Sequence, residues 1–168
     1  ATETKTVDES TTFTLDVVDK GYTYQWYHNG NAISGATQNT YTIEKIKSTN
    51  SGTYHCNISN SVSTVNSTTI NLTVYKSSQV IIFPEIGVKT YGDEDFTLSE
   101  ITDKGLTITY QSTNTSVATV SGNKVHITGV GETNITATQI GNDDYLEAAY
   151  VTRKLVVNKI TQTITFDE

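Results

Sequence analysis

The sequence predicts an all-β chain that folds as two tandem β-sandwiches. Tyr, Thr, Ser and Asn are plentiful among its 168 residues, with one Pro and no Met. β-Branched and aromatic residues favour strands, whereas Asn, Gly and Ser favour turns. Short runs that alternate apolar and polar residues recur along the chain, and no stretch shows a sustained helical period. The length suits two small domains.

The first module is predicted to cover residues 1–76 and to contain five clear strands. The run at 11–18 alternates apolar residues on one face, and the run at 22–30 ends in an Asn-Gly turn signal. The other three runs lie at 39–46, 51–60 and 67–76. Strands spaced this closely, with room for two or three more, are typical of a sandwich.

The second module is predicted to cover residues 77–158. The alternating pattern pauses at 75–79, a short stretch without Gly that we interpret as the linker. Residues 143–150 are helix-prone but too short and poorly capped for a helix, so we expect an ordered loop there. The strand patterns of this module lie at 79–83, 96–101, 106–112, 117–122, 124–130, 133–140 and 151–158.

A heptad near the end of the chain repeats the beginning of the second module. Gln, Ile, Phe and Glu of the heptad at 79–85 recur in the heptad at 162–168, an offset of 83 residues (162 minus 79). A fixed offset indicates a tandem array. Residues 159–168 are therefore predicted to begin a further, truncated repeat. The alternative is a chance similarity between two β-rich heptads.

Composition also excludes several classes of function. The net charge is −7, and no cluster of Lys and Arg is long enough to follow a phosphate backbone, so nucleic acid is not an expected partner. No apolar run is long enough to suggest a membrane span. The chain starts without Met or a signal-peptide pattern, as expected of a processed protein or an excised fragment. One Cys excludes a disulfide within the chain.

Residues 10 to 75 resemble an immunoglobulin domain of the I-set-like kind. The resemblance is carried by Trp26 in YQWYHNG and by Tyr54-x-Cys56 in NSGTYHC. In that family, the Trp packs against a disulfide between strands B and F, and the Tyr forms a corner at the start of strand F. The resemblance implies these core roles for Trp26 and Tyr54.

This sequence departs from the family because the cysteine of strand B is missing. The alternation of Phe13, Leu15 and Val17 puts Val17 where that cysteine would stand. We therefore expect Cys56 to point into the core toward Val17 and to pack beside Trp26 as a small apolar group. The alternative is a reactive or metal-binding thiol.

Residues 79 to 158 resemble the bacterial immunoglobulin-like repeats of surface proteins. The motifs are KTYGD-x-x-F-x-L, S-x-N-x-x-V-A-x-V and G-x-G-x-x-x-I-T-A-x-Q-x-G-N-x-x-Y, which together cover most of the module. The resemblance implies a second immunoglobulin-like sandwich and an extracellular setting on a bacterial cell.

No combination of residues predicts catalysis, so we expect no enzyme activity and no cofactor. His28, His55 and His126 are scattered, and no two have metal-ligand spacing. No nucleophile motif occurs.

Two acidic clusters are weak candidates for calcium. Each offers several oxygen ligands in a loop that contains Gly, which suits a hard cation, but neither matches a full calcium-loop motif. The alternative is a pair of soluble, acidic turns. The candidate ligands are Asp93, Glu94, Asp95, Asn142, Asp143 and Asp144.

Three tyrosines around Trp26 are candidates for contact with a glycan. Alternation places Tyr22 and Tyr24 on the same face as Trp26, and Tyr27 on the opposite face. Most tyrosines in a sandwich are core or cross-strand residues, which is the alternative.

The function that the sequence favours is a non-catalytic structural or adhesive module of a larger bacterial cell-surface or secreted protein. Its expected partners are neighbouring immunoglobulin-like modules of the same parent chain, and a cell-surface protein or glycan as ligand. The alternative is a carbohydrate-binding accessory region of a secreted enzyme that degrades polysaccharides. Fold alone does not decide between them.

Overall fold

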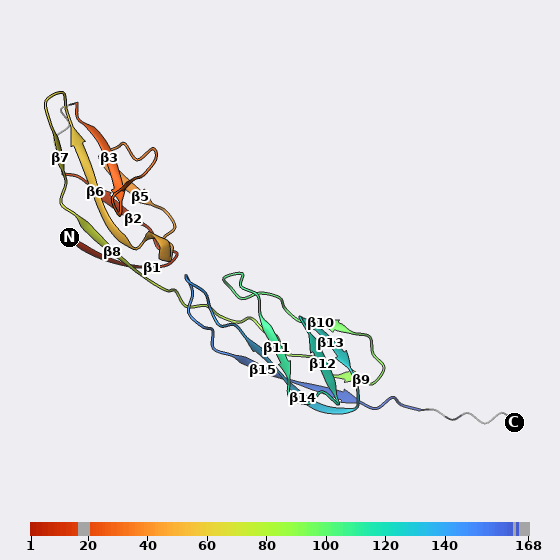
Figure 1. The fold of residues 1–168 in the computed structure, drawn as a ribbon. Helices are drawn as coiled ribbons and strands as arrows, with labels where there is room; N and C mark the ends of the chain where they lie inside the picture. The colour runs from red at the N-terminus through yellow and green to blue at the C-terminus, as the bar shows by residue number, and fades with distance from the viewer. Residues whose placement is uncertain (17–20, 163, 165–168) are drawn as a thin grey trace. The chain divides into compact units, whose positions relative to one another are not determined.

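The computed structural model describes residues 1–16, 21–162 and 164. The described residues form strands and loops with one short 3-10 helix, and the prediction of an all-β chain is confirmed (Figure 1). The chain divides into two compact units. The first comprises Ala1–Ser77 and Asp143–Tyr145, and the second comprises Ser78–Asn142 and Leu146–Glu168. The segment 143–145, which the sequence placed in the second module, is thus grouped with the first unit.

The first unit is a sandwich of two sheets. Its strands are β1 (Thr2–Thr6), β2 (Thr11–Thr14), β3 (Thr23–His28), β4 (Asn31–Ala32), β5 (Thr40–Ile43), β6 (Gly52–Ser59), β7 (Thr64–Asn66) and β8 (Ile70–Tyr75). The larger sheet has the order β1-β8-β6-β3-β4, with β7 also paired to β6, and β2 pairs with β5 in the other sheet. The 3-10 helix η1 (Ser48–Asn50) leads into β6.

Side chains that alternate along these strands build the core of the first unit. On β6, Tyr54 and Cys56 are buried while the residues beside them stay partly exposed, as the period of two requires. The buried cluster consists of Phe13, Trp26, Ala36, Ile43, Ile46, Tyr54, Cys56 and Leu72.

Strand β1 was not predicted from the sequence. It pairs in parallel with β8, from Thr2 opposite Asn71 to Thr6 opposite Tyr75. Its sequence, TETKT, has no apolar residue, so the apolar alternation that identified the other strands is absent. Backbone pairing with β8 holds this edge strand in place.

A turn closed by a carboxylate follows β1. The N–H of Thr6 donates to Glu9 Oε2 at 2.6 Å, and the N–H of Glu9 donates to the Thr6 carbonyl oxygen at 3.2 Å. Asp8, at the tip, has a φ of 75°, which Asp and Asn tolerate better than most other residues.

The Asn-Gly signal does mark a hairpin. His28 pairs with Asn31 across the turn, and Asn29 and Gly30 have φ values of 49° and 80°. Two positive φ values are the requirement of a type I′ turn, for which Asn-Gly is the preferred pair.

The second unit is also a sandwich of two sheets. Its strands are β9 (Lys89–Thr90), β10 (Phe96–Thr97), β11 (Thr109–Ser112), β12 (Ala118–Ser121), β13 (Lys124–Ile127), β14 (Gly131–Thr138) and β15 (Val151–Asn158). One sheet has the order β11-β14-β15-β9, and the other has the order β10-β13-β12. Most of these strands are shorter than their sequence patterns, while β15 covers its predicted range in full.

A separate apolar cluster fills the second unit. Fully buried Ile135 and Leu155 lie on neighbouring strands β14 and β15. The cluster consists of Ile81, Phe83, Leu98, Ile108, Tyr110, Val117, Ala118, Val125, Ile127, Ile135, Ala137, Ala148, Leu155 and Val157.

The strand predicted at 79–83 is wrong. These residues do alternate, with Ile81 and Phe83 buried, but they form no strand in the described structure. The N–H of Val80 donates to the Asp103 carboxylate at 2.6 Å, and the Phe83 carbonyl oxygen accepts from Arg153 Nε at 3.0 Å. The backbone groups of Val80 and Phe83 therefore form hydrogen bonds with side chains, where a strand would form them with the backbone of a neighbouring strand.

The second unit repeats the carboxylate-closed turn after β9. The N–H of Thr90 donates to Asp93 Oδ2 at 2.9 Å, and the N–H of Asp93 donates to the Thr90 carbonyl oxygen at 3.0 Å. The tip residue is Gly92, with a φ of 96°. As in the first unit, the strand before the turn lies parallel to the last strand, here β15.

Candidate functional site

The sole cysteine lies in the core of the first unit beside the sole tryptophan. Cys56 on β6 is directly opposite Trp26 on β3, and both side chains are fully buried. The indole Nε1 donates to the Gln38 carbonyl oxygen at 3.0 Å, and the thiol Sγ donates to the Asn57 carbonyl oxygen at 3.4 Å. Val17, the expected neighbour of Cys56, lies outside the described residues.

Tyr54 connects the start of β6 to the preceding residues through a hydrogen bond. Its hydroxyl donates to the Asn50 carbonyl oxygen at 2.8 Å, and its ring stacks on His28 with centroids 4.5 Å apart. Burial, and next the nearby Tyr41, raise the pKa of Tyr54 to about 12. The hydroxyl therefore stays protonated at physiological pH and acts as a structural donor.

The Cys56 thiol is expected to resist modification in the native protein. Burial raises its pKa above the ordinary value, more than a hydrogen bond from the Gln25 backbone lowers it, and the thiolate is the reactive form. A thiol reagent at pH 8 should react at a rate set by unfolding, and at once in concentrated urea. Rapid labelling without urea would contradict a buried thiol.

The three candidate glycan-contact tyrosines do not form one platform. Tyr24 is half-buried and packs against the core of the first unit. Tyr27 lies on the other face of the sheet, where its ring stacks on His55 with centroids 4.9 Å apart and planes 4° apart. Tyr22 lines a separate surface hollow with Ile58 and Val65.

In the first acidic cluster, two of the three carboxylates already have defined partners. Asp93 closes the turn after β9. Asp95 lies 2.7 Å from His126 Nδ1 and 3.0 Å from Lys124 Nζ. The Lys124 ammonium beside Asp95 opposes the binding of a further cation. Glu94 is the one carboxylate of the three without such a partner in the described structure, so this cluster does not fit a calcium shell.

The stability of the second unit should depend on the ionisation of Asp95. Hydrogen bonds from His126 and then Lys124 hold the pKa of Asp95 below its usual value. The unfolded-state pKa of an Asp is about 4. Because the pKa of Asp95 is lower in the folded state, its ionised carboxylate stabilises the fold at pH values above the unfolded-state pKa. This contribution is lost as the pH falls through the folded-state pKa. Asp95→Asn should therefore lower the urea midpoint of the second unit at pH 7, and it should lower that midpoint less at pH 2.

The exposed neighbour Glu94 offers the matched control for this comparison. Glu94→Gln also removes one negative charge, and it should change the urea midpoint much less than Asp95→Asn at pH 7. An Asp95→Asn effect that is equal at pH 7 and pH 2 would contradict the role assigned to the ion pairs.

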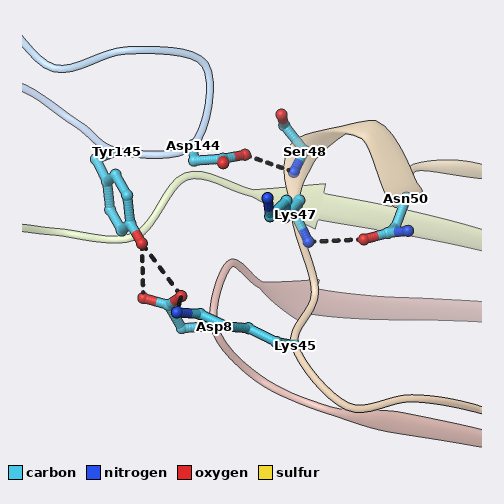
Figure 2. A network of polar contacts seen from close by, with 7 residues as sticks. All are labelled: Asp8, Lys45, Lys47, Ser48, Asn50, Asp144 and Tyr145. Atoms are coloured by element: carbon cyan, nitrogen blue, oxygen red, sulfur yellow. Dashed lines mark hydrogen bonds and ion pairs between the residues drawn. The ribbon is translucent and has the colours of Figure 1, made fainter. Parts of the chain in front are cut away.

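Asp144 of the second acidic cluster belongs to a polar network of the first unit (Figure 2). Asp144 Oδ1 accepts the N–H of Ser48 at 2.8 Å, and this bond is the main reason that the pKa of Asp144 is below its ordinary value. The Tyr145 hydroxyl donates to the carboxylate of Asp8, 3.1 Å from either oxygen. Lys45 Nζ lies 3.4 Å from Asp8 Oδ1.

This network does not fit calcium either. Asp144 is committed to a backbone N–H, while Asn142 and Asp143 are exposed. Across residues 1–16, 21–162 and 164, no three His, Cys, Asp or Glu side chains come together as a group that could hold a metal ion.

Sequence reasoning missed the contacts of Asp8 and of His126. Asp8 and Tyr145 are 137 residues apart, and nothing in either local sequence indicates the pairing. The pair between His126 and Asp95 had a weak signal, since the KVHI pattern places His126 on the exposed face of its strand. The partner strand could not be assigned from the sequence.

Comparison with known proteins supports the resemblance in the first unit. Residues 3–74 match the family model for the immunoglobulin domain. This unit is therefore immunoglobulin-like, as Trp26 and Tyr54-x-Cys56 indicated. The I-set assignment and the bacterial origin stay predictions. No curated protein sequence matches the chain.

Solved structures of immunoglobulin domains are similar to the chain only at low identity. They include Sidekick-1 domains 1–4 (13% identity, TM-score 0.40, covering 96% of this chain and 46% of that one). The insect immune protein hemolin has 15% identity and a TM-score of 0.42, covering 94% and 44%. The four N-terminal domains of Dscam1 isoform 6.9 have 17% identity and a TM-score of 0.40, covering 94% and 43%. This chain thus spans less than half of each, and the likeness carries no functional argument.

Among the residues described, no helix is both long and apolar enough to cross a membrane.

Proposed function

We propose that this chain is a non-catalytic structural and adhesive part of a larger bacterial cell-surface or secreted protein. The observation that carries the proposal is the pair of separately packed β-sandwich cores, together with a heptad that recurs after 83 residues (162 minus 79). Modules with their own cores can be added or lost without disturbing their neighbours. Such a chain serves as a spacer, or it presents a module whose ligand is a cell-surface protein or a glycan.

The polar side chains are engaged in holding the fold, which supports a structural and adhesive function rather than a catalytic one. Asp93 and Glu9 close turns, Asp95 pairs with Lys124, and Tyr54 holds a strand. These groups are engaged in holding the fold, and the residues that the structure describes assemble no recognisable reaction centre.

The carbohydrate-binding alternative lacks its main support. It needs an exposed row of aromatic rings, whereas Tyr24 packs against the core and Tyr27 stacks on His55 on the other face. We therefore do not favour it over the structural and adhesive function. A glycan array on which the chain binds a polysaccharide, with binding lost in Tyr22→Ala, would restore it.

Pulling on the chain by single-molecule force spectroscopy tests the structural role. In the first unit, load enters at the start of β1 and leaves at the end of β8. These strands are parallel over five residue pairs, so the load shears their hydrogen bonds together instead of one by one. In the second unit, β9 and β15 share only two pairs.

We expect two unfolding events, each releasing on the order of 25–30 nm of chain at about 3.6 Å per residue. The first unit should require the higher force. Thr4→Pro, which removes a backbone N–H from β1, should lower that force, and Thr4→Ala at the same exposed position should not. A single event, or two events at forces too low to measure, would contradict a module that resists mechanical force.

A further inference from the structure

One edge of a sheet in the second unit lacks a backbone partner. Strand β10 stands at the edge of the order β10-β13-β12, so only one of its sides is paired. On the paired side, the N–H of Leu98 donates to the Asn123 carbonyl oxygen at 2.8 Å. In an antiparallel pair, the backbone groups of the adjacent residues point to the opposite side. The N–H and C=O of Thr97 and the N–H of Ser99 therefore face away from β13.

These outward-facing backbone groups have no hydrogen-bond partner among residues 1–16, 21–162 and 164. Neither the N–H of Thr97 nor that of Ser99 donates within this range, and the Thr97 carbonyl oxygen accepts no bond there. The Ser99 carbonyl oxygen, in contrast, accepts from the Tyr110 hydroxyl at 2.5 Å. Unpaired N–H and C=O groups along the edge of a sheet are a template for pairing with another extended chain.

A groove lies beside this free edge, and the segment at 83–87 forms its other wall. The groove has a volume of about 220 Å³ and is lined by residues 83–87, 89 and 96–99. The segment at 83–87 forms no strand. Pro84 has no N–H to donate, and the Phe83 carbonyl oxygen already accepts from Arg153 Nε at 3.0 Å. This segment is therefore poorly suited to pair with the edge of β10.

Lys89 brings a positive charge to the groove. Its Nζ lies 4.6 Å from the ring centroid of Phe96, and no carboxylate in the described part of the chain forms an ion pair with it. The acidic residue that lines the groove, Glu85, is already paired with Arg153 Nε at 3.2 Å. The groove thus presents an ammonium group beside an apolar ring, and a carboxylate would complement this charge.

We propose that the free edge of β10 binds an extended, acidic peptide segment of a partner protein as an added antiparallel strand. The central residue of the segment exchanges two backbone hydrogen bonds with Thr97, and a C=O two residues earlier accepts the N–H of Ser99. The next residue after the central one lies opposite Phe96 and on the same face, so a glutamate there reaches Lys89. The residue before the central one lies beside the buried Leu98 and should be apolar.

This binding site goes beyond the proposed structural function. It does not depend on the tandem array, because the residues that line the groove all belong to the second unit. The site gives the module a protein ligand of defined chemistry, which is an extended segment with an apolar and an acidic side chain on one face.

Titration of the 168-residue chain with a short peptide tests the proposal. The probe is the peptide Thr-Val-Thr-Glu-Thr with both ends blocked, and the readout is the backbone amide resonances of the isotope-labelled chain. We expect the resonances of Thr97 and Ser99 to shift most, and the hydrogen exchange of these amides to slow at saturation. The amides of β2, an edge strand of the first unit, should not shift.

Matched changes separate strand addition from attraction by charge. The same peptide with Gln in place of Glu should bind roughly two- to fivefold more weakly, the usual value of a partly exposed ion pair. The two peptides should bind equally to Lys89→Gln and keep their difference with Lys159→Gln. A peptide that is N-methylated at its central residue should lose binding, because it cannot donate to the Thr97 carbonyl oxygen.

The proposal is overturned if the amides of Thr97 and Ser99 do not shift at several millimolar peptide. Binding that survives N-methylation would also overturn it, because the peptide would then not be an added strand. A difference between the Glu and Gln peptides that persists in Lys89→Gln would refute the acidic preference. Resonances of the two amides that shift with the concentration of the chain alone would assign the edge to a second copy instead.

Discussion

Trp26→Ala should destabilise the first unit by about 3–5 kcal/mol, the usual cost of removing a large buried aromatic side chain. Trp26 is fully buried, its ring centroid lies 6.0 Å from that of Phe13, and its Nε1 donates to the Gln38 carbonyl oxygen. Small domains are stable by about 5–15 kcal/mol, so the variant would lose much of its margin. Urea denaturation followed by far-UV circular dichroism measures the loss.

Two other substitutions control for this result. Trp26→Phe retains a ring and should cost less than Trp26→Ala. Val62→Ala changes a highly exposed side chain of the same unit and should stay within about 0.5 kcal/mol of the parent. If Trp26→Ala costs no more than Val62→Ala, Trp26 does not lie at the centre of the core.

Leu155→Ala should destabilise the second unit by about 2–5 kcal/mol, as expected for a buried leucine that leaves a cavity. Leu155 is fully buried on β15, the strand between β14 and β9, and belongs to the cluster that fills this unit. Amide hydrogen exchange on β14 and β15 measures the effect by residue. The exchange of these amides should become faster, while that of β3 and β6 amides should not change.

The matched control is Leu146→Ala, at a leucine of which about half is exposed. It removes the same atoms without opening a comparable cavity, and its cost should be well below that of Leu155→Ala. Equal costs at the two leucines would mean that β15 does not border the core as described.

The sequence predicted best where burial follows the period of a strand. The full length of β15 is an example, because apolar side chains there alternate with polar ones. The Asn-Gly hairpin was predictable for another reason, since its two positive φ values restrict the residue types.

Prediction failed where backbone partners, not burial, decide the structure. Strand β1 is polar and is held by β8. Residues 79–83 alternate as a strand would, yet Asp103 and Arg153 take hydrogen bonds of their backbone. In both cases, the hydrogen-bond partner lies far away in the sequence.

The candidate sites show the same limit. The sequence identified Asp95 and Asp144 as oxygen ligands for calcium by residue type. It could not show that Lys124 and His126 on β13 lie beside Asp95, or that the N–H of Ser48 already donates to Asp144. The chemistry of a side chain can be read locally, whereas its partners depend on the fold.

The chain has two cores that are stabilised separately. Trp26 is the only tryptophan, so its fluorescence reports on the first unit alone. The decisive measurement is the urea midpoint of Trp26 fluorescence in the Leu155→Ala variant. We predict the same midpoint as in the parent chain, although the second unit loses about 2–5 kcal/mol. A midpoint that falls together with that of the second unit would contradict two separate cores.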